Sequence, residues 1–153
     1  MVMTSSMTLE TLASMLLPRP QLGRIFSENE RRTLAAAADV LLEGVDFDIS
    51  ADVVVRNIER FIGGSRRAWR VRVLLEIVEL APLAVGQLPF SRGTKEQRTR
   101  FIREKVATGG HLWVLCRRIR PLIHLGAYAT PDARRRVGWI EVENRVRFLS
   151  VAA

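Results

Sequence analysis

The chain has 153 residues, of which 48% are hydrophobic and 26% are charged. This length and composition predict one globular domain around a single core and give no reason to expect long disorder. The single cysteine, Cys116, excludes an intramolecular disulfide framework and fits a reducing compartment.

The charge is distributed unevenly along the chain. The net charge is +8, but residues 1–59 contain five Arg and nine Asp or Glu, a balance of −4, whereas residues 60–153 contain nineteen Lys or Arg and seven acids, a balance of +12. Of the 24 basic residues 22 are Arg, a residue whose planar guanidinium suits paired and interface roles. A bias in codon composition would produce the same excess of Arg.

The sequence predicts no membrane span and no export signal. The most apolar region, residues 71–85, is interrupted by three charged residues and Pro82, and it is shorter than the roughly 20 residues that a bilayer requires. No basic residue precedes Leu16 and Leu17 as in a secretory signal, and Asp39 and Glu43 interrupt the apolar segment after the Arg pair 31–32. We therefore expect a cytoplasmic protein.

Three helices are predicted in the first half, after an N-terminal arm, residues 1–23, that is weakly helical between residues 8 and 17. Ser27 and Glu30 form a capping box that opens a helix running to about residue 43. Ser50 caps a second helix, which extends to Ile62 and ends at a Gly pair. Its predicted inner face comprises Val54, Val55, Ile58, Phe61 and Ile62.

The third predicted helix, residues 66–80, starts after Ser65 as a cap. It is apolar around most of its circumference and leaves a short polar remainder, comprising Arg66, Arg70, Arg72, Glu76 and Glu79. Such a helix is expected either at the centre of a bundle or partly covered by a partner.

The second half predicts further helices with marked ends. Thr94 and Gln97 form another capping box, for a helix that ends near residue 108, and residues 111–120 form a helix that Pro121 is expected to kink or end. Thr130 and Pro131 then start a short helix, and residues 141–153 form a last helix or an extended tail. The predicted fold is all-α, a single-domain bundle of about six helices over residues 24–140.

Candidates for catalytic or metal chemistry are few. Asp46 and Asp48 lie in one loop without the glycine and distal glutamate of a calcium loop, and His111, Cys116 and His124 lack a further ligand at a recognisable zinc spacing. No nucleophile elbow or phosphate-binding loop occurs. We therefore expect no catalytic, cofactor-binding or metal-binding residue in this chain.

The most distinctive stretch is residues 126–139. Tyr128 and Trp139 lie on either side of an Arg triplet that includes Arg134 and Arg135, a composition typical of interface hot spots. These four residues are the candidate partner interface. The alternative is that the two aromatic rings fix the final helix onto the bundle.

Three other functions remain open from the residues alone. The Arg clusters at 117–120 and 134–136 indicate nucleic-acid binding, with a helix-turn-helix around Gly109 and Gly110, although its second helix is too apolar to present many residues to base edges. A homodimer would cover the apolar third helix. Attachment to a membrane surface would use the N-terminal arm and the arginines.

The order of motifs resembles a known family. The motifs are the capped helix with Arg-Thr-Leu-Ala-Ala at residues 32–36, an acidic loop, a Val-rich helix, a long Arg/Leu helix, Phe90-Ser91-Arg92 before Glu-Gln-Arg, Gly126-x-Tyr128-x-x-Pro131, and Val137-Gly138-Trp139. Together they resemble the small subunit (subunit 3) of gluconate 2-dehydrogenase-type complexes. They are equally similar to the helical domain ahead of the flavin domain in some long-chain alcohol oxidases of the glucose-methanol-choline class. The resemblance covers about residues 24–140.

The resemblance implies a function that the residues alone do not. It implies a non-catalytic accessory subunit that packs on a separate FAD-dependent oxidoreductase acting on an alcohol, sugar or sterol, and that stabilises it. The FAD would belong to the partner subunit, and this chain would bind no cofactor. Because no convincing export leader is present, the implied role is stabilisation or assembly in the cytoplasm.

Overall fold

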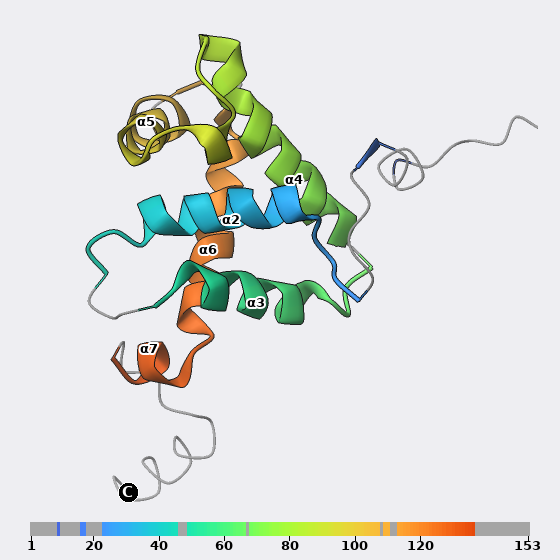
Figure 1. The fold of residues 1–153 in the computed structure, drawn as a ribbon. Coiled ribbons are helices and arrows are strands. Elements are labelled where there is room, and N and C mark those ends of the chain that lie inside the picture. The colour runs from blue at the N-terminus through green and yellow to red at the C-terminus, as the bar shows by residue number, and fades with distance from the viewer. Residues whose placement is uncertain are drawn as a thin grey trace, which may run out of the picture.

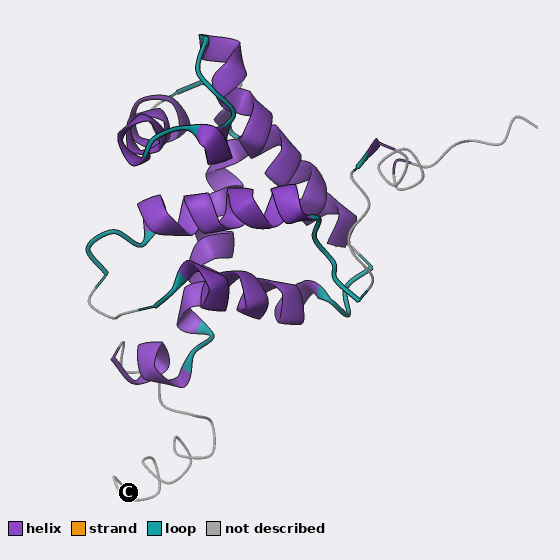
Figure 2. Ribbon diagram, viewed as in Figure 1, coloured by secondary structure: helices purple, strands orange, loops and turns teal. Residues whose placement is uncertain are grey.

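The computed structural model describes residues 9, 16–17, 23–45, 49–66, 68–107, 109–110 and 113–136 (Figure 1). Within these residues the chain forms six α-helices and no strand (Figure 2). The helices are α2 (Glu28–Leu41), α3 (Ala51–Ile62), α4 (Ala68–Leu80), α5 (Lys95–Phe101), α6 (Ile119–Tyr128) and α7 (Pro131–Arg136). The predicted all-α bundle is therefore confirmed. None of these helices combines the length and the hydropathy that crossing a bilayer requires.

The helices surround α2 and α6. Helices α2 and α3 lie side by side, α6 crosses both of them, and α4 packs obliquely against the N-terminal part of α2 (Figure 1). Helix α5 packs on the C-terminal end of α2, and α7 follows the C-terminal end of α6. Each of the four longest helices therefore contributes to one shared core.

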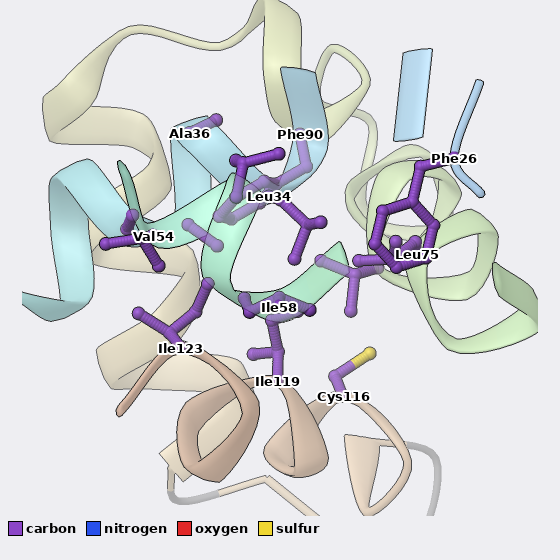
Figure 3. Packing of buried hydrophobic residues seen from close by; sticks show 14 of the residues in the cluster. Phe26, Leu34, Ala36, Val54, Ile58, Leu75, Phe90, Cys116, Ile119 and Ile123 are labelled. Atoms are coloured by element: carbon purple, nitrogen blue, oxygen red, sulfur yellow. The ribbon is translucent and has the colours of Figure 1, made fainter. Parts of the chain in front are cut away.

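The core is built from aliphatic and aromatic side chains of helices α2 to α6 and of the segments that connect them (Figure 3). Its largest fully buried hydrophobic members are Phe26, Leu34, Val54, Val55, Ile58, Leu75, Val78, Phe90, Phe101, Ile119 and Ile123. Phe101 packs edge-on against Phe90 and Trp113, with ring centroids 6.1 and 5.6 Å apart. Such edge-to-face pairs contribute about 0.5 to 1.5 kcal/mol each beyond the burial of area.

The predicted helix starts are largely confirmed. The backbone N–H of Glu30 donates to the Ser27 hydroxyl at 3.3 Å, and the Ser27 N–H donates to the Glu30 carboxylate. The Thr94 and Gln97 capping box has the same reciprocal geometry, and Ser50 accepts from the N–H of Val53. These local bonds satisfy N–H groups that have no partner inside their helix.

Two predicted boundaries are wrong. Helix α4 begins at Ala68 rather than at residue 66, with the Ser65 carbonyl accepting from the Ala68 N–H at 3.2 Å. Residues 113–118 form turns and a short 3-10 segment instead of a long helix. The helix that opens at Thr94 extends close to the predicted residue 108, although its second part, Ile102–Ala107, is π-helical and buries Val106.

Pro121 neither kinks nor ends a helix. It is the third residue of α6, which continues to Tyr128. The first four N–H groups of a helix have no intrahelical acceptor, so a proline at this position sacrifices no hydrogen bond. A proline disrupts a helix only after its first turn. Pro121 therefore lies near the start of α6 and does not cause the predicted break.

A buried polar cluster joins α2 to α4. It includes Arg72 and Glu79, two of the residues that the sequence analysis placed on the polar side of this helix. Glu79 is 4% exposed and accepts hydrogen bonds from the Thr33 hydroxyl at 2.9 Å and from the N–H and hydroxyl of Ser91 at 2.9 and 2.7 Å. Glu30, 1% exposed, accepts from Arg72 at 2.9 Å. Both carboxylates are thus buried with partners.

Several predicted features lie outside the described residues. They are the loop carboxylates Asp46 and Asp48, His111, the closing Val137-Gly138-Trp139, and the predicted tail over residues 141–153. Of the N-terminal arm the structure describes Leu9 and Leu16 as helical and exposed, and Leu17 as buried.

Candidate functional site

Helix α6 is apolar on two opposite faces. Its inner face, comprising Ile119, Ile123, Gly126 and Ala127, is buried against the bundle. Its outer face, comprising Pro121, His124, Leu125 and Tyr128, has the i, i+3, i+4, i+7 spacing of a second stripe. A surface helix of a monomer normally presents polar side chains there, so this face has the composition of a contact surface.

The outer face of α6 forms an open groove with neighbouring residues. The groove encloses about 740 Å³ and is completed by Phe61 from α3 and by Ala129 and Arg134 at the α7 end. Phe61 is 69% exposed and Leu125 is 39% exposed. We call this the α6 groove.

The position of Phe61 corrects the sequence prediction, which placed this ring on the inner face of its helix. Val54, Ile58 and Ile62 follow one another at intervals of four and fill the face that packs on the core. Phe61 precedes Ile62 by one residue and is therefore rotated by about 100° from it. The ring consequently projects beside α6 instead of entering the core.

An aromatic stack stiffens the middle of the groove. The rings of His124 and Tyr128 lie 5.8 Å apart and within 14° of parallel, one helical turn apart on α6. Burial lowers the pKa of His124, and the charge of Arg120 lowers it further. The imidazole is therefore mostly neutral at pH 7, and among the described residues that line the groove Arg134 alone carries a full charge.

Arg134 and Thr130 fix α7 to the end of α6. The Arg134 guanidinium donates to the carbonyls of Tyr128 and Ala129 at 3.3 and 3.1 Å, at a helix end that favours cations. The Thr130 hydroxyl accepts from the Ala133 N–H at 3.3 Å, as the predicted cap requires. This short connection determines where Arg134 meets the groove.

The structure brings two of the four predicted interface residues together. Tyr128 and Arg134 both line the α6 groove. Arg135 lies on exposed surface, where it pairs with Asp132, and Trp139 lies outside the described residues. Prediction from sequence missed Phe61, Pro121 and Leu125; the outer-face spacing on either side of Tyr128 was the signal that could have identified the last two.

The helix-turn-helix that the nucleic-acid alternative would require around Gly109 and Gly110 is not seen in the described residues. Residues 113–115 are turn-like, and the short 3-10 segment Cys116–Arg118 leads directly into α6. Arg117 donates to the carbonyl of Val106 at 2.8 Å and also to that of Gly109. This arginine therefore ties a turn together.

The remaining candidates for reactive or metal-binding residues do not form a site. Cys116 is a free, buried thiol, and burial raises its pKa. Among the described residues no group of three or more His, Cys, Asp or Glu side chains converges as metal ligands would.

A second apolar groove of about 540 Å³ runs along α4, and Leu16 and Leu17 of the N-terminal arm form part of its wall.

Comparison of the chain with protein-family models, with curated proteins and with solved structures finds no match. The resemblance to the oxidoreductase small subunits therefore stays a hypothesis drawn from the motifs, and the α6 groove is the feature from which a function can be argued.

Proposed function

We propose that this chain is a non-catalytic accessory subunit that binds and stabilises a larger protein through the α6 groove. The observation that carries the proposal is the second apolar face of α6, with Phe61 beside it. Large apolar side chains exposed together around a hollow are typical of interaction sites. Covering Phe61 and Leu125 would remove that surface from water.

The charge of the groove indicates what the partner presents. Arg134 lies at one end, Arg120 is exposed on α6, and no carboxylate is found among the described residues that line the groove. A partner segment with an aromatic or aliphatic anchor and a neighbouring carboxylate would match it. The class of partner, an FAD-dependent glucose-methanol-choline oxidoreductase, is proposed from the resemblance of the sequence motifs.

The direct test is co-expression with a neighbouring flavoprotein oxidoreductase, followed by co-purification and measurement of Kd. Phe61→Glu and Leu125→Glu are each expected to weaken binding by about 2 kcal/mol, roughly thirtyfold in Kd, because each places a charge in an apolar contact. Leu83→Glu is the matched control, since Leu83 is 50% exposed and lies outside the groove. The thermal unfolding of the lone variants should stay close to that of the wild type.

Three results would redirect the proposal. Equal loss of binding in all three variants would place the interface elsewhere or indicate a general effect of charge. If the pair never co-purifies while the lone chain binds DNA with a steep salt dependence, the nucleic-acid function replaces the accessory one. A concentration-dependent dimer that Phe61→Glu dissociates would instead support the homodimer.

A further inference from the structure

We propose that the groove along α4, here called the α4 groove, binds a small organic cation in which an aliphatic chain carries an ammonium group. The groove encloses about 540 Å³, a volume typical of ligand sites. Its described lining comes from the N-terminal arm, α4, the 3-10 segment Ala81–Val85 and the turns before α6. None of these lining residues also lines the α6 groove, so this site can be tested independently of the proposed function.

Helix α4 presents one of its faces to the groove. Val73, Glu76, Ile77 and Leu80 recur at i, i+3, i+4 and i+7 and therefore lie along one side of the helix. Other residues of α4, among them Leu75, are buried in the core. The face toward the groove is thus aliphatic with a single carboxylate within it.

The N-terminal arm limits the groove to the size of a ligand. Leu16 and Leu17 form part of its wall, and Leu17 is only 9% exposed although Leu16 is 81% exposed. Leu17 therefore already packs at this edge. A helix of another protein would have to displace it, whereas a single aliphatic chain can enter the space that is left beside it.

Glu76 is the residue that selects a cation. It is the sole Asp, Glu, Lys or Arg among the described residues that line the groove, and its buried Oε1 has no hydrogen-bond partner. The neighbouring carboxylates differ, because Glu30 accepts from Arg72 at 2.9 Å and both oxygens of Glu79 accept hydrogen bonds. A buried polar atom without a partner is costly. An ammonium group would supply N–H donors and the opposite charge to this carboxylate.

The electrostatic surroundings of Glu76 agree with this choice. Burial raises the pKa of Glu76, Glu30 and Glu79 raise it further, and Arg72 opposes them. The groups around Glu76 therefore leave its carboxylate short of positive charge. A bound ammonium ion would correct this, while the aliphatic walls require the rest of the ligand to be apolar.

The test is isothermal titration calorimetry of the full chain with octylammonium, 1-octanol and octanoate, which share one chain and differ in the end group. At about pH 7 an alkylamine is protonated, as the Lys side chain is. We expect octylammonium to bind with a Kd roughly tenfold below that of 1-octanol, and octanoate to bind most weakly. Glu76→Gln should remove the roughly tenfold preference and leave the Kd of 1-octanol unchanged. Glu43→Gln, the matched control, removes an exposed charge outside the groove and should change neither Kd.

A second variant locates the site without altering its charge. Ala84 is exposed and lines the groove, so Ala84→Trp should fill the hollow and weaken octylammonium and 1-octanol alike, with the helix content by circular dichroism unchanged. Three results each overturn the proposal: equal affinity for octylammonium and 1-octanol, equal losses in Glu76→Gln and Glu43→Gln, or a Kd that Ala84→Trp leaves unchanged. Absence of saturable octylammonium binding also overturns it, and leaves the groove to a second copy or to a protein segment.

Discussion

At the scale of single residues, the carboxylate of Glu79 is the clearest stabilising group. It accepts from Thr33 on α2 and twice from Ser91, and so joins three parts of the chain that are distant in sequence. Glu79→Gln keeps the shape but removes the charge that strengthens these bonds. We expect a loss of about 1 to 2 kcal/mol in the free energy of unfolding, measured by urea denaturation.

The control for this prediction is Glu43→Gln. Glu43 is exposed and pairs with Lys95 across the surface at 3.3 Å, and such pairs contribute between zero and about 1 kcal/mol. Equal losses in the two variants would show that burial of Glu79 adds no stability.

A second residue, Glu76, is expected to make the free energy of unfolding depend on pH, because its pKa is raised in the folded chain. Burial raises the pKa of Glu76 above its ordinary value of 4.5, and Glu30 and Glu79 raise it further, although Arg72 opposes them. The unfolded chain therefore loses this proton first as pH rises, so the native state loses stability between pH 4.5 and the raised pKa. Glu76→Gln removes the effect.

The expected result is that Glu76→Gln gains stability relative to the wild type as the pH rises from about 4 to about 7. Free energies of unfolding at several pH values measure the difference. A difference that is constant with pH, or that falls as pH rises, would contradict the assignment of the raised pKa to Glu76.

At the scale of secondary-structure elements, the contact between α3 and α6 depends on Gly126. A Cβ at this position would lie 2.7 Å from Ile58 Cγ1 and 2.8 Å from the Val54 carbonyl oxygen. The Asn57 side chain also donates to the Gly126 carbonyl at 2.9 Å. The two helices therefore approach so closely that any side chain at Gly126 must move one of them.

Gly126→Ala is expected to cost about 1 to 3 kcal/mol, because overpacking exceeds the gain in helix propensity. Gly64→Ala is its matched control: no atom lies within 4 Å of a Cβ there, so the change should be neutral or stabilising by up to about 1 kcal/mol. Urea denaturation of both variants measures the contrast. A stable Gly126→Ala would mean that α3 and α6 can separate at little cost.

At the scale of the whole molecule, one core connects the helices. Its buried members come from α2, α3, α4, α5 and α6 and, outside these helices, from Phe26, Phe90, Val106 and Cys116. We therefore predict a single cooperative unfolding transition, in which helix content by circular dichroism and tryptophan fluorescence change together. Separate midpoints for the two signals would show that part of the bundle unfolds independently.

The net charge of +8 also acts at this scale. The basic excess of residues 60–153 belongs to the same half of the sequence as α6 and α7, which carry Arg120 and Arg134. Under the proposed function, this charge would attract an acidic partner. Steering of this kind raises association rates more than it slows dissociation.

The sequence by itself determined the features that act over three or four residues. The capping boxes at Ser27 and Thr94, the caps at Ser50 and Thr130 and the helical periodicity of α2 and α3 all follow from neighbouring residues. Together with the absence of strand patterns, they were sufficient for the all-α prediction. Tyr128 and Arg134 could be selected because aromatic and guanidinium groups near one turn are visible in the sequence.

Only the tertiary structure decided what each face of a helix contacts. Glu79 is buried because Thr33 and Ser91 meet it, Phe61 is exposed because Ile58 and Ile62 fill the core, and the same α6 is covered on one face and open on the other. These outcomes depend on packing between residues far apart in sequence, which local patterns do not encode. The candidate site therefore changed from a stretch of residues 126–139 into a groove that α3, α6 and α7 form together.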